Sequence, residues 1–110
     1  MKKKAFIEEE LYKKASINDL ILFGIYSVTT GAKKCQFETL VHQCFRLFPK
    51  VFALSDYPKW PDSRKLDRPL RTLRNKRLIT GNPKTSFSLT KRGKKKALEI
   101  ANVFRQGKLL

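Results

Sequence analysis

The sequence predicts a mainly α-helical domain with one small β-hairpin, in the order helix, short strand, helix, helix, two strands, helix. Three observations lead to this fold class. Four stretches place apolar residues three or four positions apart, as helices with one buried face do. Residues 78–89 instead hold two short apolar segments around a Gly81-Asn82-Pro83 turn signal, as a hairpin does. The 110 residues, 41% of them hydrophobic, fit one domain without an internal repeat.

The first core helix is predicted between a cap at Ser16 or Asn18 and a stop at Gly31. The charged residues 1–15 before it are expected to form a helical or frayed arm outside the core. A short extended stretch over residues 33–36 should follow the helix. The apolar residues at helical spacing, which we expect to be buried, are Leu20, Ile21, Ile25 and Val28.

A second helix is predicted from Phe37 to Phe48, because Pro49 would end it. Residues 50–61 then form an unusually long connector, in which a short helical turn over residues 51–54 can form. The expected buried face of the helix consists of Leu40, Val41, Cys44, Phe45 and Phe48. The aromatic residues of the connector could stack on bases, but we expect them to close the core beneath it: Phe52, Tyr57 and Trp60.

A third helix is predicted from Asp62-Ser63 to about Lys76, with apolar positions at Leu66, Leu70 and Leu73. Pro69 lies inside this pattern and lacks a backbone donor, so the helix should kink there or restart with Asp67 as a new cap. Strands at 78–80 and 86–89 follow, around a turn at 81–84. Thr90 can cap a last helix through Phe104, whose inner face holds Ala97, Ile100, Ala101 and Phe104. The predicted domain spans residues 16–106, between the arm and a tail at 107–110.

Two motifs carry a resemblance to a known family. Leu70-Arg71-Thr72-Leu73 leads to Leu78-Ile79, and Leu89-Thr90-Lys91-Arg92-Gly93 precedes the last helix. In these motifs and in element order, roughly residues 17–104 resemble the winged helix-turn-helix superfamily. The resemblance implies an α-β-α-α-β-β-α fold whose third helix and hairpin, or wing, contact DNA. The superfamily also includes protein-interaction modules.

The charge of the chain indicates a polyanionic partner independently of that resemblance. The 25 Lys and Arg and 9 Asp and Glu residues give a net charge of +16. Residues 1–61 hold ten basic and six acidic residues, a net +4, whereas residues 62–110 hold fifteen and three, a net +12. Thirteen basic and two acidic residues fall within 62–96, a net +11. We therefore expect a nucleic-acid partner, with duplex DNA favoured over RNA.

The candidate contacts fall on the third helix, the hairpin and the last helix. Arg71 and Asn75 are four residues apart and should project together, as recognition of guanine and adenine in a major groove requires. Five charges in six residues oppose the dipole at the start of the last helix, and phosphate would reverse that repulsion. The predicted groove contacts are Arg64, Lys65, Arg68, Arg71, Thr72 and Asn75. The predicted backbone contacts are Lys84, Lys91, Arg92, Lys94 and Lys95. For each, the alternative is a solvated basic surface without a ligand.

The sequence supports no catalytic or metal chemistry. Cys35, His42 and Cys44 match no zinc-finger spacing and lack a fourth ligand. No phosphate-binding loop, dinucleotide fingerprint or nuclease motif is present. We therefore expect a non-enzymatic protein without a cofactor, acting as a transcriptional regulator or an accessory factor.

Two other functions stay open: RNA binding within a ribonucleoprotein, and a basic protein-interaction module with an acidic partner. A homodimer through the flanking helices is open as well. Two cysteines are too few for a secreted disulfide framework, and no apolar run is long enough for a membrane helix. We therefore expect no membrane partner and a cytoplasmic location, associated with the nucleoid in a bacterium or an archaeon.

Overall fold

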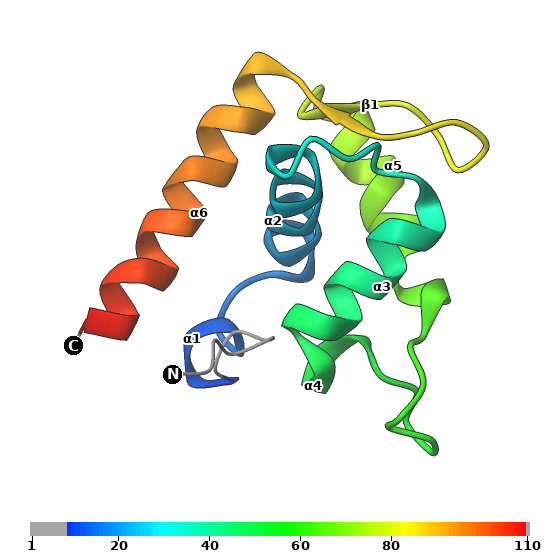
Figure 1. The fold of residues 1–110 in the computed structure, drawn as a ribbon, viewed down its shortest axis with the longest axis vertical. Coiled ribbons are helices and arrows are strands. Elements are labelled where there is room, and N and C mark those ends of the chain that lie inside the picture. The colour runs from blue at the N-terminus through cyan, green and yellow to red at the C-terminus, as the bar shows by residue number, and fades with distance from the viewer. Residues whose placement is uncertain (1–8, 110) are drawn as a thin grey trace.

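The computed structural model describes residues 9–109, and the side chains of residues 9–105 (Figure 1). This part of the chain is mainly helical with one small antiparallel sheet, so the predicted fold class is confirmed at that level. None of its helices is both long and apolar enough to cross a membrane. The elements are α1 (Glu9–Tyr12), α2 (Ile17–Thr30), α3 (Phe37–Leu47), α4 (Pro49–Phe52), the 3-10 helix η1 (Ser63–Leu66), α5 (Asp67–Asn75), β1 (Ile79–Thr80), β2 (Ser88–Leu89) and α6 (Lys91–Leu109).

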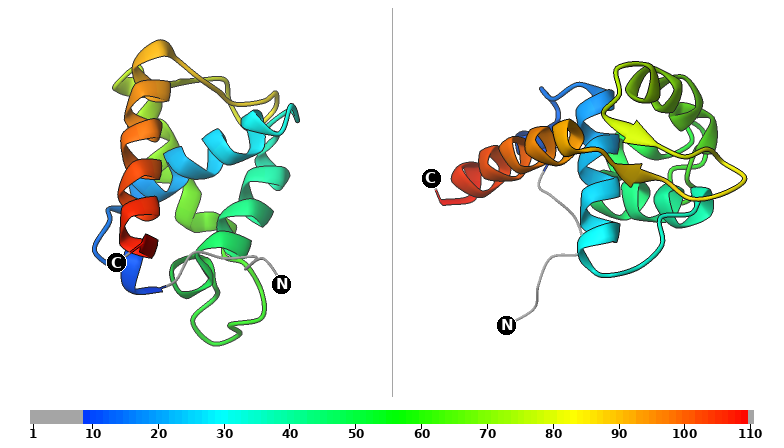
Figure 2. Two further views of the ribbon diagram at one scale, coloured as in Figure 1. Left: turned by 60° about the vertical axis from the view of Figure 1, so that its left-hand side comes forward. Right: turned by 90° about the horizontal axis from the view of Figure 1, so that it is seen from above.

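Helix α2 is the centre of the fold. The Ser16 hydroxyl caps it by accepting a hydrogen bond from the Asp19 amide at 3.2 Å, as predicted. α2 packs against α3, α5 and α6, and Figure 2 shows α6 on the opposite side of α2 from α3 and α5. Contact on several sides explains why α2 buries more than the predicted stripe. Its buried residues are Leu20, Ile21, Leu22, Gly24, Ile25 and Val28.

The predicted third helix is built in two pieces. η1 is a 3-10 turn, and an α-helix restarts at Asp67, so Pro69 falls in the first turn of α5. A missing amide hydrogen costs no intrahelical hydrogen bond there, which confirms the predicted restart. Asp67 is not the cap, because the residue before α5 is Leu66 and no side chain caps the helix. The carboxylate that acts as a cap is Asp62, which accepts from the Arg64 amide at 3.1 Å and begins η1.

Helix α5 ends in a Schellman motif that leads into the hairpin. The Leu78 amide donates to the Leu73 carbonyl and the Arg77 amide to the Arg74 carbonyl, both at 3.0 Å. Arg77 takes the left-handed conformation of this motif, with a φ of 61°. β1 and β2 then pair antiparallel through two residue pairs, as predicted.

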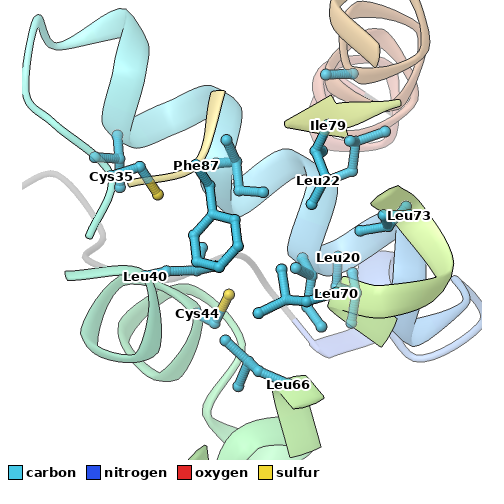
Figure 3. Close-up of a cluster of buried hydrophobic side chains, with 14 of the residues drawn as sticks. Leu20, Leu22, Cys35, Leu40, Cys44, Leu66, Leu70, Leu73, Ile79 and Phe87 are labelled. Atoms are coloured by element: carbon cyan, nitrogen blue, oxygen red, sulfur yellow. The ribbon is translucent and has the colours of Figure 1, made fainter. Parts of the chain in front are cut away.

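The hairpin is joined to the N-terminal half through Phe87. Its amide donates to the Cys35 carbonyl at 2.8 Å, in an isolated bridge that lies within the extended stretch expected at 33–36. Figure 3 shows the Phe87 ring among buried side chains that include Leu22 of α2, Leu40 of α3 and Leu70 of α5. One aromatic residue of the hairpin therefore joins three helices in the core.

The prediction that residues 1–15 lie outside the core is wrong for Tyr12. This side chain is 1% exposed, and its ring meets Phe48 edge-on at a centroid distance of 5.0 Å. Its hydroxyl accepts from the Lys50 amide at 3.1 Å. α6 continues to Leu109, so residues 107–109 of the predicted tail are helical. Residues 1–8 of the arm and Leu110 of the tail lie outside the described residues.

The connector also differs from the prediction. α4 begins at Pro49, two residues before the expected turn, and Phe52 is buried, but Tyr57 and Trp60 are 66% and 64% exposed. Residues 53–61, here called the connector loop, fold back on themselves, with the Leu54 amide bonded to the Trp60 carbonyl at 2.8 Å. This closure turns the two rings outward. Leu40 and Cys44 of α3 and Phe48, which follows it, are buried as predicted, whereas Val41 and Phe45 are only half-buried.

Candidate nucleic-acid interface

The hairpin meets α6 at a junction built by Thr90 and Gly93. The Thr90 hydroxyl accepts from the Gly93 amide at 3.0 Å, so Thr90 caps α6 as predicted. The same hydroxyl donates to the Arg77 carbonyl at 2.7 Å, and the Thr90 amide donates to the Leu78 carbonyl at 3.0 Å. A Cβ on Gly93 would lie 1.8 Å from the Leu78 carbonyl oxygen, so this close approach requires glycine. The Leu-Thr-x-x-Gly motif thus ties the start of α6 to the end of α5.

This junction brings basic residues of α5 and α6 together. Lys76 and Arg77 are exposed at the end of α5, beside the exposed Lys91 and Arg92. A shallow pocket of about 280 Å³ is lined by Leu78 and by Arg92, Lys95, Lys96 and Glu99 of α6. Lys76, Arg77 and Lys96 were not among the predicted contacts. Lys76 and Arg77 lie near α6 because Thr90 bonds to the Arg77 and Leu78 carbonyls. The sequence signal for this arrangement is the Leu-Thr-x-x-Gly motif.

The outward face of α5 carries three of the six predicted groove contacts. Leu66, Leu70 and Leu73 are buried, which leaves Arg68, Arg71 and Asn75 exposed on the opposite side, while Thr72 is half-buried on a flank. Arg71 also lines a small pocket of about 40 Å³ between α5 and Pro83 of the hairpin turn. Arg74, another residue absent from the predicted set, donates from Nη1 to the Gly81 carbonyl at 3.1 Å. α5 and the hairpin turn therefore form adjoining parts of one surface.

Lys65 has a different role from the predicted groove contact. Its Nζ donates to the Val51 carbonyl at 2.8 Å and to the Ala53 carbonyl at 3.3 Å. These oxygens lie at the end of α4, so the ammonium group fastens the start of the connector loop to η1. Arg64 pairs with Asp62 over 3.3 Å between Nε and Oδ1 while most of its side chain stays exposed. The structure leaves the Arg64 side chain exposed on η1 but turns Lys65 toward the connector loop.

The hairpin tip exposes Lys84. The Asn82 side-chain oxygen accepts from the Lys84 amide at 2.8 Å, which closes the turn locally. Gly81 has a φ of 103°, and a Cβ there would lie 1.9 Å from the Ser86 carbonyl oxygen. The backbone needs of the turn therefore explain Gly81 and Asn82, whereas they do not explain a lysine at position 84.

The basic residues at the start of α6 surround the helix and do not share one face. Lys91, Arg92, Lys94 and Lys95 are all exposed. Lys94 faces a pocket of about 520 Å³ that Tyr26, Thr29 and Ser88 also line, on the other flank from the Arg92 pocket. Among the described side chains, Arg64–Asp62 is the only ion pair within 4.0 Å, so no carboxylate pairs with these cations there. Glu99 lines the same pocket as Arg92 and Lys95, and the dipole at the helix start adds to the repulsion among the cations.

The two cysteines belong to the core. Cys35 and Cys44 are both buried, and burial raises the pKa of the Cys35 thiol to about 12 and the pKa of the Cys44 thiol further. Such thiols are poor ligands and poor nucleophiles because the thiolate is the reactive form. Over residues 9–105, no group of three or more His, Cys, Asp or Glu side chains is arranged to hold a metal ion.

Comparison with known proteins finds no relative of this chain, since no protein-family model, curated protein or solved structure matches it. The candidate interface is thus defined by its own residues: the outward face of α5, the hairpin turn and the first two turns of α6, joined at Thr90.

Proposed function

We propose that this protein is a winged helix-turn-helix protein that binds duplex DNA without catalysing a reaction. α5 enters a major groove, and the hairpin and the start of α6 hold the adjacent phosphate backbone. The observation that carries the proposal is the junction at Thr90, which joins three basic elements with a net charge of +11 over residues 62–96. Such a surface neutralises phosphates and releases counterions, which is the main source of affinity for DNA.

The order of elements supports the winged helix assignment. α2, the bridge at Cys35, α3, α5, the two strands and α6 follow the order that the family resemblance implies. The hairpin lies beside α5 and is fixed to it by Arg74, as a wing beside a recognition helix must be. α4 and the connector loop are additions between the second and third core helices.

The residues on α5 suit groove recognition. Arg71 and Asn75 are exposed one turn apart, so they can reach neighbouring base pairs, with arginine suited to guanine and asparagine to adenine. Lys84, Lys91, Arg92, Lys94 and Lys95 offer flexible ammonium and guanidinium groups to phosphate oxygens. The role that follows is that of a transcriptional regulator or an accessory factor.

The proposal is tested by fluorescence anisotropy of labelled duplex DNA over a salt series. The expected result is tight binding at low salt. The logarithm of the association constant should fall linearly with the logarithm of the salt concentration, with a slope of about −0.9 for each phosphate contact. Absence of binding at low salt, or an affinity that does not change with salt, would contradict the proposal. Selection of bound sequences from a random pool then shows whether the protein reads sequence.

RNA binding is the second candidate, and the exposed rings of Tyr57 and Trp60 favour it because unpaired bases stack on such rings. Competition among duplex DNA, duplex RNA and single strands separates the two candidates. A preference for single strands that Trp60→Ala abolishes would favour RNA.

A further inference from the structure

One exposed carboxylate lies within the proposed DNA surface. Of the two acidic residues within 62–96, Asp62 is buried and accepts hydrogen bonds from Arg64 at 3.1 and 3.3 Å. Asp67 is instead exposed, at the first residue of α5. Over residues 9–105, it caps no helix and has no basic partner within 4.0 Å. This carboxylate therefore lies on a surface with thirteen basic residues, where it repels the phosphates that the surface is proposed to bind.

Asp67 lies on the flank of α5 that meets the hairpin turn. Together with Arg71 and Arg74, it lines the small pocket beside Pro83. Arg71 follows it by four residues, so the two side chains project from the same side of the helix, about 6 Å apart along its axis. Arg74 is occupied by the Gly81 carbonyl, to which its Nη1 donates at 3.1 Å. The carboxylate is thus one turn before the predicted guanine contact, at the N-terminal end of α5, where recognition helices contact base edges.

The chemistry of a carboxylate selects one base in the major groove. An ionised carboxylate only accepts hydrogen bonds. Guanine and thymine present acceptors there, and adenine presents its N7 acceptor beside its amine. Cytosine presents its N4 amine, which is a donor. A carboxylate that faces base edges is therefore repelled by guanine and thymine and is matched best by cytosine.

We propose that Asp67 selects cytosine in the DNA sequence that α5 reads, within one or two base pairs of the guanine that Arg71 contacts. This inference rests on the proposed function. The carboxylate accepts a hydrogen bond from the N4 amine of cytosine, and the same charge repels a duplex that offers no such donor. Asp67 thus increases the ratio of specific to non-specific affinity, because it penalises the wrong sequence as well as stabilising the right one.

The helix dipole gives Asp67 a second effect that the test must separate. A carboxylate in the first turn of a helix is stabilised by the positive end of the dipole, and this needs no ligand. That effect acts on the stability of the folded protein, whereas contact with a base acts on sequence preference. Sequence preference is therefore the quantity to measure.

The test is selection of bound duplexes from a random pool with the wild-type chain and with Asp67→Asn. The sequence selected by the wild type should contain a cytosine within two base pairs of the guanine whose preference Arg71→Ala removes. Asparagine pairs with adenine, so Asp67→Asn should change the preference at that one position from cytosine to adenine and leave the guanine unchanged. In fluorescence anisotropy, the ratio of affinities for the wild-type sequence and for random duplexes should fall about tenfold in this variant.

Asp56→Asn is the matched control, because it makes the same change in net charge at an exposed residue of the connector loop. It should leave the selected sequence unchanged. The proposal is overturned if Asp67→Asn also selects the wild-type sequence. Such a result with a loss of stability in urea would assign Asp67 to the helix dipole alone. A change confined to the guanine would overturn the cytosine contact as well, because it would assign Asp67 to orienting Arg71.

The same experiment separates this inference from the proposed function. If the wild-type chain does not bind duplex DNA at low salt, the proposed function itself is contradicted. If it binds duplex DNA but selects no sequence, or selects one that Asp67→Asn does not alter, only the role of Asp67 is contradicted.

Discussion

Two surfaces of this small chain have opposite character. Residues 62–96, with a net charge of +11, expose lysine and arginine around α5, the hairpin and α6. Residues 37–61, with a net charge of +1, expose aromatic rings beside an apolar groove. The first surface suits a uniformly charged ligand that is recognised over long range, and the second suits a partner recognised by shape. The difference teaches that the positive charge is concentrated in one part of the chain, and the proposed binding of DNA is one explanation that the following experiments test.

Gly93→Ala should give the largest effect, because it attacks the junction that holds the basic surface together. The new methyl group would lie 1.8 Å from the Leu78 carbonyl oxygen, so the junction must open. The free energy of unfolding should fall by about 3 kcal/mol in urea denaturation. Gly31→Ala is the control, since its Cβ would be 3.5 Å from the nearest atom, and it should change stability by less than about 0.5 kcal/mol. Equal stability of the two variants would contradict the close approach.

The double variant Lys94→Glu, Lys95→Glu tests whether charge acts by location. It should raise the dissociation constant for duplex DNA about a hundredfold at low salt and reduce the salt slope by about 1.8. The control is Lys13→Glu with Lys14→Glu, which makes the same change in net charge at two exposed residues after α1. Anisotropy should show a much smaller loss for that control. Equal losses would mean that the net charge of the chain sets the affinity for DNA and that the location of the charge does not.

Arg71→Ala sharpens the comparison within the basic surface. Loss of a bidentate contact to guanine should lower the affinity for the preferred sequence about tenfold and leave the affinity for random DNA almost unchanged. Lys84→Ala should instead lower the affinity for all DNA sequences by the same factor, because a phosphate contact carries no sequence information. Selection from a random pool with both variants measures the contrast, and an unchanged preference in Arg71→Ala would remove α5 from sequence reading.

Arg77→Gly should give the smallest effect, and in the direction of greater stability. Arg77 holds a left-handed conformation at the end of α5, where glycine carries no steric penalty. Thermal and urea unfolding should show a gain of about 1 kcal/mol. Arg77→Ala removes the same charge but keeps the penalty, so it should not gain stability. A gain in both variants would indicate relief of charge repulsion.

The sequence predicted best what local chemistry decides. Ser16 and Thr90 cap helices as expected, because a cap involves residues only three positions apart. The restart near Pro69 follows from the missing amide hydrogen of one residue. The hairpin and its turn follow from Gly81 and Asn82. The binding function of these elements is a proposal that the experiments above test.

Contacts between distant segments could not be predicted in this way. Tyr12 is buried because it meets Phe48 and the amide of Lys50, which is 38 positions away. In the sequence Lys65 does not differ from the other basic residues of the predicted third helix. In the structure its ammonium group donates hydrogen bonds to two carbonyls at the end of α4. Trp60 and Tyr57 are large aromatic residues of the kind usually buried in a core. In the folded connector loop, which the bond between Leu54 and Trp60 closes, both side chains are exposed.

The brevity of the hairpin ladder has a consequence for its motion. β1 and β2 share only two residue pairs, and the amide of Phe87 adds one more bond to Cys35. Opening the tip breaks few hydrogen bonds and uncovers little apolar surface, so it needs far less free energy than global unfolding. We expect the backbone amide hydrogens of residues 82 and 84–86 to exchange with deuterium much faster than those of α2. The tip of the hairpin can thus rearrange when it binds a ligand, while Phe87 stays packed in the folded core.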